Sequence, residues 1–202
     1  MFVLTSLLTQ AAGKLGEEWR PLLLRLAEET VNTVVPQPRD DEMDLRAYVK
    51  VKCVAGGSLA DCRLVSGEVC SLQLVHKGMK GTIHQPRIAL VANSIMFQRD
   101  EGRFVSLDTL AMQEEEYIKN VTGRLLASQP SVVLVERTVS RLAQEIFLRE
   151  GVSLALNVKF RVLTRLARLT QGEIINSVDS MLASPRLGTC DTFYCRYKWT
   201  PL

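Results

Sequence analysis

The chain has 202 residues, of which 47% are hydrophobic and 6% aromatic, and 25 basic against 22 acidic residues give a net charge of +3. This composition is typical of a globular protein with a buried core. The near balance of charge argues against nucleic acid or a charged membrane as the main partner. No apolar run approaches the roughly 20 residues of a transmembrane helix.

Cysteine usage and the chain ends indicate where the protein resides. The five cysteines are odd in number and form no CxxC pair, and the first residues lack the basic region of a signal peptide. These features favour free thiols in a reducing intracellular compartment. Because the chain starts within a helical pattern and stops abruptly, we expect it to be a fragment of a longer protein.

The first part of the chain is predicted to be mainly helical. One helix is expected over residues 2–12, and a clearer one over residues 19–34, where apolar side chains recur with helical spacing before Pro36. Residues 48–53 alternate between apolar and polar as in a half-exposed strand. Gly56-Gly57 is a candidate hinge between subdomains.

After this hinge the pattern becomes strand-like. Residues 63–70 are predicted to form a strand with Gly67 at a bulge, and residues 87–91 a buried strand. A loop with two glycines and two lysines, residues 76–81, lies between them. Residues 94–98 are expected to begin another edge strand.

The strongest structural prediction lies in the second half. A long helix over residues 107–125 precedes two apolar runs, residues 132–135 and 152–158, which are joined by an amphipathic helical stretch. This order predicts a right-handed parallel βαβ unit. Thr138 is the predicted N-cap of the connecting helix, and Gly151 is placed to end it in a left-handed conformation.

The last part of the chain is predicted to hold two helices. Residues 160–170 form the first, with Gly172 at its end, and residues 176–182 a shorter second one. In the first helix the residues expected to face inward are Val162, Leu163, Leu166 and Leu169, and those expected to face outward are Arg161, Arg165 and Arg168.

Signatures of catalysis are missing from the sequence. It contains no GxxxxGK[ST] loop, no GxGxxG after a strand, and no GxSxG or HExxH motif. The two histidines, His76 and His84, have no cysteine at zinc-ligand spacing, so we expect no metal and no cofactor in this fragment. A cysteine nucleophile paired with either histidine stays open, although Cys62 and Cys70 fit strand positions more simply.

Two sets of basic residues are candidates for contact with an anion or a partner. Lys77 and Lys80 lie in the glycine-containing loop, whose backbone amides could hold a phosphate. The stripe of Arg161, Arg165 and Arg168 could meet an anionic lipid or an acidic partner. For each set a solvated surface is the simpler interpretation.

Several phrases of the sequence resemble known proteins. Residues 64–70 (LVSGEVC), 76–79 (HKGM) and 86–90 (PRIAL) resemble the start of the apical domain of a group II chaperonin, and the βαβ unit with the helix after it resembles the end of that domain. A narrower set of phrases looks like the chaperonin-like region of PIKfyve-type phosphatidylinositol 3-phosphate 5-kinases. These phrases are residues 39–44, Gly56-Gly57 and residues 134–141, 169–172 and 187–190.

This resemblance, which covers about residues 17–196, implies a fold and a division of the chain. The implied class is α/β, a chaperonin apical-domain-like swivelling β/β/α fold flanked by helices of an intermediate-type subdomain. Residues 1–56 would be an N-terminal helical segment, residues 57–164 the apical-like domain and residues 165–202 a returning helical segment.

The resemblance also implies a role. The fragment would be a non-catalytic module of a lipid kinase whose ATP site lies elsewhere, and it would help to assemble the kinase with a HEAT-repeat scaffold and a Sac-type phosphoinositide phosphatase. The parent would be cytoplasmic and peripheral to the endosomal or vacuolar membrane. Two other roles stay open, namely a module that binds anionic phosphoinositides and a domain that passively binds polypeptide.

Overall fold

The computed structural model describes residues 18–34, 48–52, 58–97, 106–178 and 185–195. The chain divides into two compact units, Met1–Val69 and Cys70–Leu202. The predicted division at residues 56 and 164 stays a prediction. The predicted helix over residues 2–12 and the Gly56-Gly57 hinge lie outside the described residues.

In the first unit the predicted helix is confirmed as α2 (Trp19–Thr33), after which the N–H of Val34 bonds to the carbonyl of Thr30. A short 3-10 turn, η1 (Leu59–Asp61), follows. The predicted strands over residues 48–53 and 63–70 are wrong, because the residues of these ranges that the structure describes do not have strand conformation. Alternation alone does not make a strand: Val51, Val65 and Val69 of the pattern are exposed, and a strand needs a neighbouring backbone to pair with.

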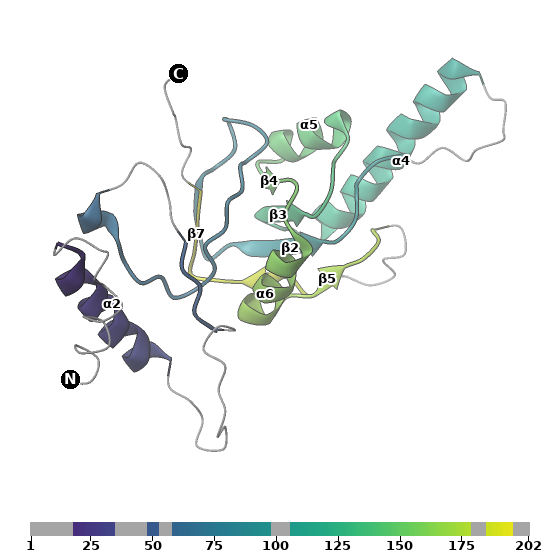
Figure 1. Ribbon diagram of the computed structural model, residues 1–202. Coiled ribbons are helices and arrows are strands. Elements are labelled where there is room, and N and C mark those ends of the chain that lie inside the picture. The colour runs from purple at the N-terminus through teal and green to yellow at the C-terminus, as the bar shows by residue number, and fades with distance from the viewer. Residues whose placement is uncertain (1–17, 35–47, 53–57, 98–105, 179–184, 196–202) are drawn as a thin grey trace. The chain divides into compact units, whose positions relative to one another are not determined.

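The second unit is built on a sheet of mostly parallel strands (Figure 1). Its strands are β2 (Arg87–Val91), β3 (Val132–Val135), β4 (Ser153–Ala155), β5 (Ile174–Ile175) and β6 (Gly188–Thr189). The order is β4-β3-β2-β5, all parallel, and β6 pairs antiparallel with β2 beside β5. β3 is buried throughout, as expected for a parallel strand covered on both faces.

Three helices connect these strands. α4 (Leu107–Ala127) leads from β2 to β3, and α5 (Arg141–Arg149) leads from β3 to β4, which confirms the predicted βαβ unit. α6 (Phe160–Thr170) runs from β4 to β5 at the other end of the sheet and packs against β5 and β6. Because such crossovers are right-handed, α4 and α5 cover one face and α6 covers the opposite face (Figure 1).

The core of this unit lies between the sheet and its helices. The four central β2 and β3 pairs run in register from Ile88 opposite Val132 to Val91 opposite Val135. Helical side chains reach these strands from both faces and are fully buried, among them Ile118, Leu125, Phe147 and Leu163. Burial of this apolar surface supplies the main driving force for folding.

A second, two-stranded sheet was not predicted from the sequence. β1 (Thr82–His84) pairs antiparallel with β7 (Thr192–Tyr194), with Ile83 opposite Phe193. Both side chains are half-buried against the core, and their neighbours on each strand are exposed. The sheet therefore ties the end of the unit to the segment before β2.

Several predicted details are corrected at the helix ends. Ser140, not Thr138, caps α5, because its hydroxyl accepts the N–H of Ala143 at 3.3 Å. Gly151 is left-handed as predicted, with φ +71°, but α6 ends on a left-handed Gln171 rather than on Gly172. Leu169, predicted to face inward, is 50% exposed.

Two predicted elements are replaced by shorter contacts. Residues 94–97 form no strand, and Ile95 makes a parallel bridge to Val139. Residues 176–178 are not helical, and β5 ends just before them. The rest of that predicted helix lies outside the described residues.

A close approach holds α6 against β6. A Cβ on Gly172 would meet the backbone nitrogen of Gly188 at 2.7 Å, and a Cβ on Gly188 would meet the Cβ of Thr170 at 2.7 Å. Only glycine fits at both positions without a shift of the backbone.

Candidate interaction surface

The loop of residues 76–81 is held by its own atoms. The Nδ1 of His76 accepts the N–H of Gly78 at 3.0 Å, and the carbonyl of His76 accepts the N–H of Met79 at 3.1 Å. These two backbone amides are therefore engaged within the loop. They are not available to a phosphate, so a cradle in this loop would have to use other amides.

The same loop is anchored to the outer edge of the main sheet. The side chain of Met79 is buried, and its sulfur accepts the N–H of Leu154 in β4 at 3.3 Å. The hydroxyl of Ser153 donates to the carbonyl of Lys80 at 2.8 Å. Lys77 and Lys80 both stay exposed. They form a small basic rim beside β4.

The three predicted arginines lie on the outer side of α6. Arg161 and Arg168 are exposed, and Arg165 is half-buried. Two large apolar residues flank them, since Phe160 and Leu169 are each 50% exposed. We call these five residues the arginine face.

The arginine face is regular because of the helical repeat. Residues four apart form ridges on a helix, so Phe160 shares one ridge with Arg168, while Arg161 and Arg165 share the next with Leu169. Each ridge thus joins an apolar side chain to at least one guanidinium group. Such a surface can pack against an amphipathic partner that presents carboxylates.

The structure does not bring the two basic sets together. Lys77 and Lys80 lie beside β4, whereas α6 packs against β5 and β6 at the other end of the strand order. A single ligand could therefore contact both basic sets only if it extended across the whole sheet. The sequence pattern identified the arginines but missed Phe160, whose place on the outer ridge could have been inferred from its spacing of eight residues to Arg168.

Two ionisable groups of the described chain, Glu115 and Cys190, have a shifted pKa. The ammonium of Lys119, 2.6 Å from Glu115, holds the pKa of that carboxyl below its usual value. Burial raises the pKa of the Cys190 thiol, with a smaller opposing contribution from its hydrogen bond to the backbone of Thr192.

Within the described ranges, no three His, Cys, Asp or Glu side chains gather as metal ligands would. The helices among the described residues are too short or too polar to span a membrane.

A model of a known protein family matches nearly the whole chain. The model of the TCP-1/cpn60 chaperonin family matches residues 2–199. An open-state monomer of a group II chaperonin from Methanococcoides burtonii superposes with a TM-score of 0.68 at 23% identity, over 89% of this chain and 40% of that one. The predicted chaperonin-type α/β fold is thereby confirmed.

Curated relatives narrow the comparison further. The chain is 41% identical over 186 residues to the human 1-phosphatidylinositol 3-phosphate 5-kinase, over 91% of the chain and 9% of the kinase. The corresponding kinase of Saccharomyces cerevisiae is 31% identical over 178 residues, which is 8% of its length. T-complex protein 1 subunit gamma of Dictyostelium discoideum is 30% identical over 189 residues, which is 36% of its length. The chain thus spans about a tenth of the kinases that it matches, and the predicted resemblance to their chaperonin-like region is confirmed.

Proposed function

The chain belongs to the TCP-1/cpn60 chaperonin family, and we propose that it is a non-catalytic interaction module of a phosphatidylinositol 3-phosphate 5-kinase. One observation carries the proposal: the chain aligns with the human kinase over 91% of its own length but over 9% of the kinase. A chaperonin-type domain that is so small a part of a kinase leaves phosphoryl transfer to the remainder of that enzyme.

The proposal includes the partners and the place of the parent protein. The module assembles the kinase with a HEAT-repeat scaffold and a Sac-type phosphoinositide phosphatase, as the resemblance implies. The parent is a lipid kinase with its ATP site outside these residues, cytoplasmic and peripheral to the endosomal or vacuolar membrane. An assembly role of this kind requires surface that the fold itself does not use.

The arginine face supports this role. Phe160 and Leu169 are each 50% exposed, and α6 contains three arginines and no acidic residue. Arginine and large apolar residues are the types that contribute most to protein interfaces. The face is therefore the best candidate for the contact.

The test uses the full-length kinase that contains this chain. Deletion of the region is expected to abolish co-precipitation of the scaffold, and the double reversal Arg161→Glu with Arg168→Glu is expected to weaken it at least tenfold. Arg141→Glu is the matched control, because Arg141 is exposed on α5 and away from the arginine face. Scaffold binding that survives deletion of the region would refute the proposal, provided that the kinase remains folded.

A second candidate function is binding of anionic phosphoinositides. The observation that favours it is the same group of arginines, since each basic residue near an anionic surface contributes about 1 kcal/mol. Flotation of the chain with liposomes should then rise with phosphoinositide content and fall steeply with salt. Absence of flotation at low salt would exclude this function.

A further inference from the structure

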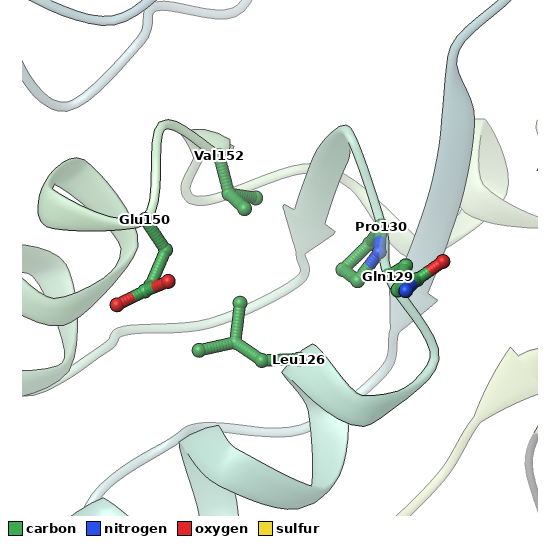
Figure 2. Close-up of a pocket in the computed structure, with 5 residues that line it drawn as sticks. All are labelled: Leu126, Gln129, Pro130, Glu150 and Val152. Atoms are coloured by element: carbon green, nitrogen blue, oxygen red, sulfur yellow. The ribbon is translucent and has the colours of Figure 1, made fainter.

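A hollow of about 240 Å³ lies where α4 and α5 end. It is lined by Leu126, Gln129, Pro130, Glu150 and Val152. Figure 2 shows Glu150 on one side, Gln129 and Pro130 on the other, and Leu126 and Val152 between them. The size suits one long side chain rather than a whole ligand of drug size.

Charges of both signs lie around this hollow: Arg124 and Arg149 stand in the last turns of α4 and α5, and Glu150 is the acidic residue of the lining. Two helices finish beside it, with Ser128 and Glu150 as their C-caps, and the C-terminal end of a helix carries partial negative charge. The carboxylate of Glu150 has no ion pair and no hydrogen bond to any residue that the structure describes. An incoming cation therefore meets an unengaged acceptor at the rim.

The floor and the neighbouring charges limit what can fit. Pro130 and Val152 are buried and Leu126 is half-buried, so the floor offers apolar contact to a methylene stem. The guanidinium of Arg87 is held 3.5 Å from the Oε1 of Gln129 but does not line the hollow. A carboxylate on the ligand would gain no favourable contact with Glu150.

We propose that this hollow is a socket for one lysine or arginine side chain of a partner protein, with the charged head at Glu150 and the stem on Leu126, Pro130 and Val152. The inference rests on the proposed function in one respect, namely that a partner protein supplies this side chain. It assigns a second contact, opposite in charge to the arginine face, to the same interaction module.

The test needs no partner protein, so its outcome is separate from that of the co-precipitation. The ¹⁵N-labelled chain is titrated with Nα-acetyl-lysine N-methylamide and, in parallel, with the uncharged norleucine analogue. We expect saturable shifts of the Leu126, Glu150 and Val152 amides with the lysine probe, and binding about two- to fivefold weaker with norleucine. Glu150→Gln should weaken lysine binding by the same factor and leave norleucine binding unchanged.

Glu173→Gln is the matched control, because Glu173 is an exposed carboxylate that does not line the hollow. It should bind the lysine probe as the unsubstituted chain does. Equal binding of the two probes, an unchanged affinity in Glu150→Gln, or shifts that never saturate would each overturn the socket. None of these results would bear on whether the domain binds the scaffold.

Discussion

The sulfur of Met79 accepts the backbone N–H of Leu154, 3.3 Å away, at the outer edge of β4. Beside it, the N–H of Val75 donates to the carbonyl of the same residue at 3.0 Å. Together the two bonds satisfy both backbone groups of Leu154, which a neighbouring strand would otherwise do. A thioether thus completes the edge of a sheet.

Replacement of Met79 by leucine tests this role. The two side chains have similar volume, so the main loss is the acceptor for a buried N–H, and we expect a decrease in unfolding free energy of about 1–2 kcal/mol. Urea denaturation followed by circular dichroism measures it. Met112→Leu is the control, because Met112 is 73% exposed and should change stability by less than about 0.5 kcal/mol. Equal effects of the two substitutions would contradict the role of the sulfur.

Replacement of glycine by alanine is expected to have opposite effects on stability at Gly188, in the contact between α6 and β6, and at Gly123, in α4. Gly188→Ala would drive a methyl group into Thr170 and should lower the unfolding free energy by about 1–3 kcal/mol. Gly123→Ala, in α4 with open space around its Cα, should raise it by about 0.5–1 kcal/mol through better helix propensity. Thermal denaturation of both variants gives the two signs, and a stabilised Gly188→Ala would show that the close approach is absent.

The cap of α5 can be assigned by a pair of alanine substitutions. Ser140→Ala removes the hydroxyl that accepts the N–H of Ala143 and should cost about 1 kcal/mol. Thr138→Ala, at the position that the sequence pattern favoured, should stay within about 0.5 kcal/mol, because this side chain is exposed. Denaturant midpoints distinguish the two, and the reverse order would restore Thr138 as the cap.

The raised pKa of Cys190 predicts that folding stability and thiol reactivity change with pH in the alkaline range. Because burial raises its pKa in the folded state, the folded chain holds this proton to higher pH than the unfolded chain does. The related stability is present below the ordinary thiol pKa and is lost as pH rises through the raised value. Alkylation of Cys190 by iodoacetamide, followed by mass spectrometry from pH 7 to 10, should show a midpoint above that of a small-molecule thiol. A midpoint at or below the small-molecule value would contradict the shift.

Elements with a strong local pattern were predictable from the sequence. α2, α4, α6 and the β3-α5-β4 unit each carry enough apolar residues at one spacing to define their type, and residues 87–91 form a buried strand as expected. The left-handed position of Gly151 also follows from local chemistry, since few other residues adopt that conformation at low cost.

Elements defined by distant partners were not predictable. β5 and β6 are two residues long, and they are strands only because β2 lies beside them. β1 depends on β7, which is more than 100 residues away in sequence. Residues 63–69 show the converse, because they have the alternation of a strand but do not form one.

The candidate site was predictable to the same extent. Helical spacing put the three arginines on one side of α6 and could also have placed Phe160 there, but it put Leu169 on the inner side, where the structure has it 50% exposed. The hollow near Glu150 depends on where two separate helices end in space, and no local pattern reports this.

β2 pairs with three strands, and the last of them ends at residue 189. During synthesis the ribosome releases residues 87–91 long before this last partner emerges. Non-local pairing of this kind is slow, and an unpaired apolar strand is prone to aggregate. We therefore expect the nascent domain to remain prone to aggregation until nearly the whole unit has been translated. Formation of any one helix should not end this risk.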